Sequence, residues 1–357
     1  AYRDPKRVMQ DYGAPHLVFE IAAPQGSEEI IFYAAVPKRF ETLVEKQIHG
    51  FYPTAQIEKI SDYNIFHPSG TEAGAYLKLK KISALPVVTY QVLDIDPLNN
   101  LTNALSKLGK EEGGAIQILL RPAPSGWSKR GNRVVQLLKK GKSLKHAMYE
   151  TGGGIGWIVR EIFNILSASS EKKPEEAKII AEEIVKPIET KNLKSGFEVN
   201  IRVLTSAADK ERAKELLDHL EAGFLQFNSP DLNSFAAVHP KYLKKLNFDF
   251  SFRQFNERQK FILSTEELAS VFHFPLASTA TPKIKWLKAK AAPPPADLPE
   301  QPILVLGKNI SDFILFYLVP ALATLFFIYA GFQILLGGGI PSRVQAGLNI
   351  FRTTVSG

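Results

Sequence analysis

Hydrophobic and polar residues are mixed over most of the chain, but one stretch near its end is uniformly apolar. Residues 313–336 read FILFYLVPALATLFFIYAGFQILL and contain no charged side chain. An α-helix rises about 1.5 Å per residue, so a helix of this length spans the ~30 Å hydrocarbon core of a bilayer. We therefore predict a transmembrane helix within residues 310–339. A buried core helix is the alternative, but core helices seldom need so many uncharged residues in a row.

Residues inside this stretch predict its shape and its contacts. Pro320 predicts a kink, because proline lacks an amide hydrogen and clashes with the preceding turn. Ala330 and Gly331 are small enough for close helix packing, and an amide side chain that faces lipid is costly. We therefore expect a contact with another helix through Ala330, Gly331 and Gln333.

Upstream, short alternating apolar runs predict strands, and apolar residues three or four apart predict helices. In the first third of the chain, the expected strands are residues 17–21, 30–36, 56–60, 75–82, 86–93 and 115–122, and the expected helices are residues 40–51 and 97–108. Asp96 followed by Pro97 predicts the start of the second helix, with Asp as N-cap. Asp94 and Asp96 therefore fit a strand end and a helix cap better than a pair of catalytic acids.

The second half again has a strand followed by a helix. The expected elements are a strand at 197–207 (FEVNIRVLTSA), an amphipathic helix at 208–227 and a strand at 246–255 (LNFDFSFRQF). The sequence LSTEELASVFHFP predicts a closing helix that is capped by Ser264 or Thr265, with Glu267 in its first turn.

Mixed strands and helices of this size indicate an α+β fold. Because the two halves share their order of elements, we predict two similar ferredoxin-like α/β sandwich units, joined by a helical connector and followed by the transmembrane helix. The predicted division is a first α+β unit (1–122), a basic and charged helical connector (123–196), a second α+β unit (197–276), a Pro-rich linker (277–309), the transmembrane helix (310–339) and a short amphipathic tail (340–357).

Composition limits the classes of function. The 357 residues are 45% hydrophobic and 22% charged, which is typical of folded globular material. The chain contains no cysteine, so disulfides, thiolate nucleophiles and cysteine-based metal sites are excluded. A formal net charge of +8 predicts an acidic partner, either nucleic acid or anionic lipid. Because the chain opens with Ala1 and not with Met, we expect a processed or incomplete N-terminus.

Two glycine motifs resemble ligand loops but lack required residues. Residues 141–143 (GKS) end like a phosphate-binding loop, but that loop needs a glycine five residues earlier, where Gln136 stands. The cluster at 152–156 is followed by Val159 in place of the third glycine of the dinucleotide fingerprint. We therefore expect no nucleotide cofactor, and we interpret the second cluster as a break between helices.

The histidines predict no metal site, because no two of them are three or four residues apart. They stand at positions 16, 49, 67, 146, 219, 239 and 273. We expect no catalytic, cofactor-binding or metal-binding residue, and hence a protein that is not an enzyme.

Nucleic acid and anionic lipid remain candidate partners. Phe248, Phe250 and Phe252 lie on one face of an expected strand, as in RNA-binding sheets, but the glycines of such sheets are missing, so a core face is favoured. The candidate contact with an anionic partner consists of two basic clusters: Lys129, Arg130 and Arg133, and Lys139, Lys140, Lys142 and Lys145. Such clusters are usually a solvated helix face, but with the net charge they also fit weak, non-specific binding of DNA or anionic lipid.

Several segments resemble a known family. They read IIFYAAVPKRFETLVEKQIHGFYPTAQIEKISDYNIF, FEVNIRVLTSA, LSTEELASVFHFP and TPKIKWLKAKAAPPP. Together they are similar to the region before the motor domain in bacterial membrane-anchored ATPases of the type IV secretion and conjugation class, over residues 17–309. In that family a segment like LVLGKN would open into the ATPase, whereas here it leads into the apolar stretch. Residues 318–357 resemble instead the small pilin subunits of type IV secretion systems.

We therefore expect a membrane-anchored, non-catalytic scaffold or accessory subunit of a type IV secretion or conjugation-like apparatus, with membrane lipid and secretion-apparatus proteins as partners. The alternatives are a nucleic-acid-binding module held at the membrane, and the remnant of a conjugation ATPase that has lost its motor. Lysines at 283, 285, 288, 290 and 308 precede the apolar stretch, and only arginines at 343 and 352 follow it. The positive-inside rule thus predicts a single-pass protein of the cytoplasmic membrane, with the bulk of the chain in the cytoplasm.

Overall fold

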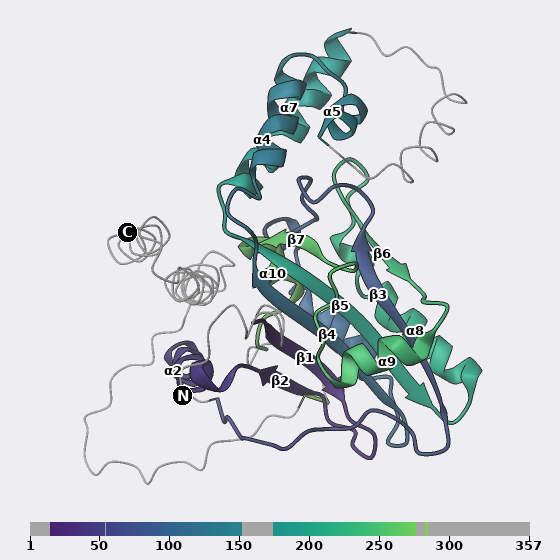
Figure 1. Ribbon diagram of the computed structural model, residues 1–357. Helices are drawn as coiled ribbons and strands as arrows, with labels where there is room; N and C mark the ends of the chain where they lie inside the picture. The colour runs from purple at the N-terminus through teal and green to yellow at the C-terminus, as the bar shows by residue number, and fades with distance from the viewer. Residues whose placement is uncertain (1–14, 54, 152–173, 276–282, 285–357) are drawn as a thin grey trace, which may run out of the picture.

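One antiparallel sheet organises the computed structural model, which describes residues 15–53, 55–151, 174–275 and 283–284 (Figure 1). Its strands are β1 (Leu17–Ala23), β2 (Ile31–Ala35), β3 (Thr71–Leu79), β4 (Gly113–Pro122), β5 (Gly196–Ala207), β6 (Phe235–Val238) and β7 (Phe261–Ser264). The strand order is β2-β1-β4-β5-β3-β6, and β7 pairs with the start of β5. All of these pairs are antiparallel. The α+β class predicted from the sequence is therefore confirmed.

The central strand of this sheet is β5, whose 12 residues are all buried. It pairs with β4 along one edge and with both β3 and β7 along the other. Side chains alternate between the two faces of a strand, so Ile201 joins the main hydrophobic core on one face and Arg202 lies on the other. The strand is buried on both faces although its sequence alternates, because the polar side chains Glu198, Asn200 and Arg202 are themselves buried.

Four helices contribute to the main core on the first face of the sheet: α2 (Glu41–Phe51), α3 (Leu98–Leu105), α8 (Lys210–Ala222) and α10 (Thr265–Val271). The predicted cap of α10 is confirmed, whereas α3 begins one residue later than predicted, with Pro97 as its N-cap. The carboxylate of Asp96 accepts the amide of Leu98 at 2.8 Å at the start of α3. Ser264 and Glu267 form a capping box at the start of α10, in which each side chain accepts the other residue's amide.

The opposite face of the sheet is covered by α9 (Leu243–Ser251), where the sequence pattern predicted a strand at 246–255. That prediction is wrong. Leu246 and Phe250 are buried against the sheet, whereas Phe248 and Phe252 are exposed. An alternation of period two also contains pairs that are four residues apart, and such pairs share one side of a helix. The same spacing therefore fits a helix with one apolar side turned inward and a second turned outward.

Two further predicted strands are also wrong. Residues 56–60 have no regular structure and are exposed, and residues 86–93 contain only the 3₁₀ turn η2 (Tyr90–Val92). Neither segment is paired with a strand of the sheet. The remaining 3₁₀ turns of the described chain are η1 (Lys38–Phe40) and η3 (Leu225–Phe227).

The chain between β4 and β5 forms a helical bundle that stands at one end of the sheet (Figure 1). Its helices are α4 (Lys129–Lys139), α5 (Leu144–Glu150) and α7 (Pro174–Asn192). The bundle has its own small core, which includes Val134, Leu138, Met148 and Ile188. Leu85, from the segment that follows β3, is buried in the same core and joins the bundle to the sheet.

The expectation of two separate units at 1–122 and 197–276 is wrong. β4 and β5 are neighbouring strands, with Pro122 opposite Phe197, and β3 lies between β5 and β6. Neither range therefore has a sheet of its own, and the 123–196 segment is an insertion into a hairpin. The order of elements along the chain repeats, but strand pairing does not follow that order.

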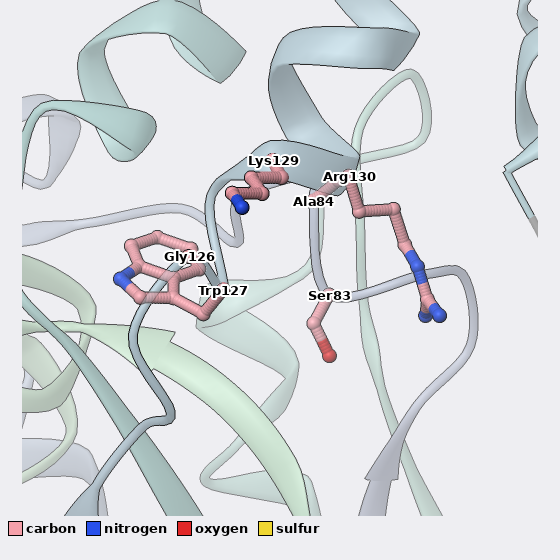
Figure 2. Close-up of a pocket in the computed structure, with 6 residues that line it drawn as sticks. All are labelled: Ser83, Ala84, Gly126, Trp127, Lys129 and Arg130. Atoms are coloured by element: carbon pink, nitrogen blue, oxygen red, sulfur yellow. The ribbon is translucent and has the colours of Figure 1, made fainter.

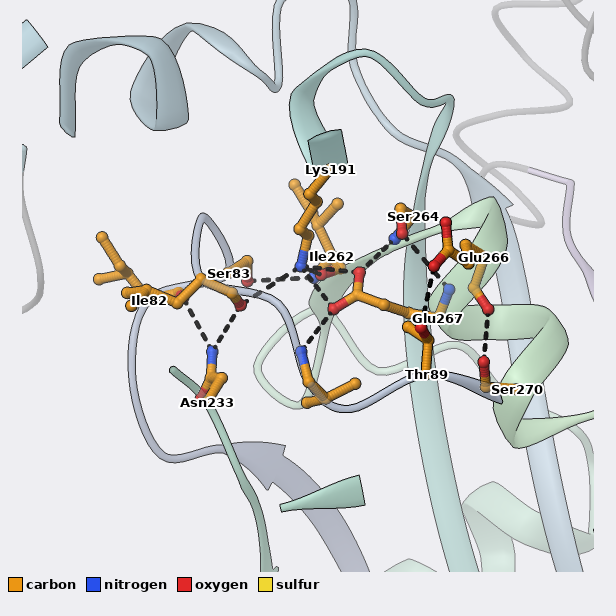
Figure 3. A network of polar contacts seen from close by, with 12 residues as sticks. Ile82, Ser83, Thr89, Lys191, Asn233, Ile262, Ser264, Glu266, Glu267 and Ser270 are labelled. Carbon is orange, nitrogen blue, oxygen red and sulfur yellow. Dashed lines mark hydrogen bonds and ion pairs between the residues drawn. The ribbon is translucent and has the colours of Figure 1, made fainter. Parts of the chain in front are cut away.

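A buried ion pair fastens the bundle to the sheet (Figure 3). The ammonium of Lys191, in the last turn of α7, lies 2.8 Å from the carboxylate of Glu267, and both side chains are 1% exposed. The amides of Val87 and Ser264 also donate to this carboxylate, at 2.9 and 2.7 Å. Burial lowers the pKa of Lys191, and the attraction of Glu267 opposes that shift.

In the described part of the chain, no helix combines the length and the apolar character needed to cross a bilayer. The stretch for which the sequence predicts a transmembrane helix, with Pro320, Ala330, Gly331 and Gln333, lies outside the described residues. The same is true of the 340–357 tail, of the glycine cluster at 152–156, and of the 277–309 linker apart from residues 283–284.

We predict that Lys191→Met lowers the free energy of unfolding by about 3–5 kcal/mol, because it leaves the carboxylate of Glu267 buried without its cation. Denaturant unfolding followed by circular dichroism measures the loss. The control is Lys194→Met, since Lys194 is 27% exposed and pairs with Glu266 closer to solvent. If the two variants lose equal stability, the buried pair does not fasten the bundle as described.

Candidate functional site

Helix α4 has an apolar side and a basic side. Val134, Val135, Leu137 and Leu138 are buried in the bundle core. This arrangement leaves the cations of α4 and of the turn after it on the outside, and Lys129, Arg130, Arg133, Lys139, Lys140 and Lys142 are all exposed. Lys145 lies in α5. The structure therefore brings six of the seven predicted basic residues onto one helix and its C-terminal turn.

These six cations fall into two groups. Arg133 lies 2.6 Å from Glu150, and Lys139 lies 2.6 Å from Glu189. Hydrogen bonding by Arg133 lowers the pKa of the Glu150 carboxyl. Lys129, Arg130, Lys140 and Lys142 form no ion pair within the described residues. These four cations are the charges that α4 offers to a partner.

A cavity of about 320 Å³ lies at the N-terminal end of α4. It is lined by Ser83, Ala84, Gly126, Trp127, Lys129 and Arg130. In Figure 2 the Lys129 side chain lies above the Trp127 ring, whereas Arg130 extends on the other side, beyond Ser83. The cavity thus combines two cations, an aromatic ring and a hydroxyl.

Two glycines hold Trp127 in this wall. Gly126 has φ of +84°, a left-handed conformation that turns the chain from β4 into α4. Gly196, at the start of β5, lies against the indole, and a Cβ at this position would come within 2.5 Å of the ring atom Cε2. The absence of a side chain at 196 therefore lets the indole pack flat on the end of the sheet.

The start of α4 adds a positive potential to the cavity. Its N-cap, Ser128, makes no side-chain capping hydrogen bond, and the first turn contains no acidic residue. The amides of the first helical turn lack partners within a helix, and the aligned peptide dipoles give that end a partial positive charge. The cavity can therefore bind a phosphate-sized anion beside a stacked aromatic group.

The GKS motif at 141–143 has a different role. Gly141, with φ of +76°, follows the last turn of α4. The amide of Lys142 donates to the carbonyl of Leu137, and the amide of Gly141 donates to the carbonyl of Leu138. This pair of hydrogen bonds is the Schellman motif, which is a common way for a helix to end. The motif explains the glycine and leaves Lys142 as one of the exposed cations.

A second polar cluster lies under α9, on the buried face of the sheet. Glu20, Gln117 and Arg202 stand opposite one another on β1, β4 and β5. Gln117 donates to Glu20 at 2.7 Å, and Arg202 donates to Gln117 at 2.9 Å. Burial lowers the pKa of Arg202 to about 10. Each of these polar residues stands among apolar residues of a different strand, so the sequence does not indicate that the three side chains meet.

Metal chemistry finds no support in the described part of the chain, where no three His, Cys, Asp or Glu residues are placed to share an ion. Trp127 and Ser83 are the site residues that sequence reasoning missed. The Trp127–Ser128–Lys129–Arg130 run offered a signal, since an aromatic residue next to cations at a helix start is a common anion-binding arrangement. Ser83 is 44 residues away, and no local pattern indicated its position.

The protein thus has an α+β fold with one antiparallel sheet, and a basic helical bundle is inserted between the neighbouring strands β4 and β5. The chain belongs to the family described as a domain of unknown function, DUF8128, whose model matches residues 7–287. No curated protein and no solved structure matches the chain. The family match ends before the apolar stretch at 313–336.

We predict that Gly196→Ala displaces the Trp127 ring, because the new Cβ occupies the place of the indole. In a Trp157→Phe/Trp286→Phe background, Trp127 is the remaining tryptophan, and its emission should shift to the red as the ring enters water. Gly50→Ala is the matched control, since a Cβ there meets no atom within 4 Å. An unchanged emission spectrum in Gly196→Ala would contradict the packing described here.

Proposed function

We propose that the protein is a membrane-tethered, non-catalytic accessory subunit that binds single-stranded nucleic acid through α4 and the adjacent cavity. The observation that carries this proposal is the group of four cations on and beside α4 that have no ion pair among the described residues, with Trp127 at one end of the group. Proteins that bind single strands combine a basic track for the phosphates with an aromatic ring on which a base stacks.

Binding is favoured over catalysis by the chemistry of the cavity. Its lining contains two cations, an indole and a hydroxyl, and none of the six lining residues is a carboxylate or an imidazole. General acid–base catalysis usually depends on one of those groups within hydrogen-bond reach of the substrate. The lining residues are therefore suited to holding an anion and a ring in place.

The setting of this activity is also part of the proposal. The uncharged stretch at 313–336 supports a membrane anchor, and the resemblance of residues 17–309 to secretion and conjugation ATPases supports a place in an apparatus of that type. In such an apparatus, a nucleic-acid-binding subunit at the cytoplasmic face would hold a strand close to the membrane.

We predict that Lys129→Gln/Arg130→Gln weakens the binding of single-stranded DNA and flattens its salt dependence. Each phosphate contact contributes about 0.7 to the slope of log Kd against log salt for a single strand, so the loss of two contacts should reduce the slope by about 1.4. Fluorescence anisotropy with a labelled oligonucleotide, titrated at several salt concentrations, measures both quantities.

The matched control for this experiment is Arg133→Gln/Lys139→Gln. It removes the same formal charge from the same helix, but these two cations are already paired with Glu150 and Glu189. It should therefore change the slope much less. Equal effects of the two double variants would indicate a general attraction to net charge, and undetectable DNA binding at low salt would refute the proposal.

We also predict that Trp127→Ala weakens binding by about 1–3 kcal/mol, because one base loses its stacking partner. The salt slope should stay unchanged, since no phosphate contact is removed. The same anisotropy titrations test both statements. A change of slope without a loss of affinity would show that the ring does not stack on a base.

A further inference from the structure

Helix α9 exposes an apolar surface that the proposed function does not use. The side chains of Phe248 and Phe252 are 54% and 62% exposed, and their ring centroids lie 4.6 Å apart. Tyr242, just before the helix, is 71% exposed. Three aromatic side chains within eleven residues are therefore exposed on and just before α9, and two of them, Phe248 and Phe252, are in contact with each other.

The orientation of α9 is fixed from below. Arg202 donates to the carbonyl of Asp249 at 2.9 Å, and Gln117 donates to the carbonyl of Phe250 at 3.0 Å. These carbonyls lie at the C-terminal end of the helix, where they also accept the backbone amides of Gln254 and Arg253, and the positive charge of Arg202 favours that end. A roll of the helix that buried Phe248 would therefore break the hydrogen bonds that Arg202 and Gln117 donate to these carbonyls.

Lysines accompany the aromatic rings. Lys241, Lys244 and Lys245 are exposed on and just before the first turn of α9. The acidic residue of this helix, Asp249, is 3% exposed and accepts a hydrogen bond from Lys245 at 3.1 Å. The outward side of α9 thus presents cations and apolar rings without a free carboxylate.

We propose that Lys241, Tyr242, Lys244, Lys245, Phe248 and Phe252, here called the α9 surface, dock on the headgroup region of an anionic bilayer. Aromatic rings enter the boundary between headgroups and acyl chains, while lysines reach lipid phosphates from the same helix. Anionic lipid also attracts each lysine electrostatically. The lysines of the α9 surface thus match the lipid phosphates, and its aromatic rings match the boundary between headgroups and acyl chains.

The geometry disfavours the other partners. Phe248 and Phe252 pack on each other at 4.6 Å with a 37° tilt, which leaves no slot between them for a base. A symmetric contact with a second copy would bring the same lysines towards one another, and like charges repel. The inference does not depend on the nucleic-acid proposal, because α4 lies in the inserted bundle and α9 lies on the face of the sheet.

A label next to the rings tests this docking. The chain has no cysteine, so Ser251→Cys gives a single site for an environment-sensitive fluorophore on the exposed end of α9. The labelled full chain is reconstituted with nanodiscs of phosphatidylcholine alone or with a third of phosphatidylserine. We expect blue-shifted emission and protection from aqueous iodide only with phosphatidylserine. A label at Glu211→Cys, on α8 and on the opposite face, should stay accessible in both.

Variants measure the contribution of each part. Phe248→Ser/Phe252→Ser should reduce the docking equilibrium, given by the ratio of protected to accessible label, about tenfold or more per ring. Lys241→Gln/Lys244→Gln should reduce it about fivefold per lysine. The control Leu225→Ser, which removes an apolar side chain that is 63% exposed in η3, should leave docking unchanged. Unchanged thermal melts establish that the variants fold.

Several results would overturn the inference. They are a label that is equally accessible in both nanodiscs, protection that survives the double phenylalanine variant, and a chain that does not co-purify with anionic nanodiscs. Protection by added single-stranded DNA without anionic lipid would assign the α9 surface to nucleic acid, and protection that rises with protein concentration would assign it to a second copy. Loss of DNA binding in the α4 variants would not alter any of these conclusions about the α9 surface.

Discussion

A single buried carboxylate, that of Glu267, joins the parts of this protein. It caps α10, accepts the amide of Val87 from the segment after β3, and pairs with Lys191 at the end of α7. A buried charge is tolerated only where its lone pairs are fully used, and here three elements supply the donors. Together with Leu85, which is buried in the core of the bundle, this group holds the helical bundle and the cavity at α4 against the sheet.

The two basic surfaces of the protein are supported by polar contacts of different kinds, which are buried below α9 and exposed beside α4. Below α9, Arg202 and Gln117 bind the carbonyls at the helix end. Below α4, the amide of Asn192 donates to Asn132 at 2.9 Å, and Gly131 allows α4 to approach α7 closely at the same point. Both surfaces are thus carried by elements that are fixed from beneath, so each can present its cations in a constant arrangement.

Local patterns predicted the local features of this fold. The capping box at Ser264 and Glu267, the hydrogen bond from the Leu98 amide to Asp96, and the strands near residues 75–82 and 115–122 follow from residue types within a few positions. Pairing between distant strands did not follow, because the long buried run of β5 contains no signal that chooses β3, β4 and β7 as its neighbours. The two-unit interpretation failed for that reason.

The candidate site was predictable in part. The six cations on and after α4 were visible as clusters, and the helical period placed them on one side. The sequence did not show which of these cations are paired with a carboxylate, because Glu150 and Glu189 come from other helices of the bundle. The same limit applies to the segment with Phe248, Phe250 and Phe252. Its spacing fits both a strand and a helix, and polar groups of the sheet below bind its backbone as a helix.

The insertion of the bundle into a hairpin has a mechanical consequence. Ala123 and Gly196 are joined by a hydrogen bond at the root of the insertion, next to the first rung between β4 and β5. A pull on the bundle away from the sheet would load this ladder one rung at a time, as in the opening of a zipper, which is the weakest direction for a pair of strands. The contact between Lys191 and Glu267 lies beside that root and would carry the tension first. If α4 binds single-stranded nucleic acid as proposed, tension on that nucleic acid would reach the bundle without opening the sheet for as long as the ion pair stays intact.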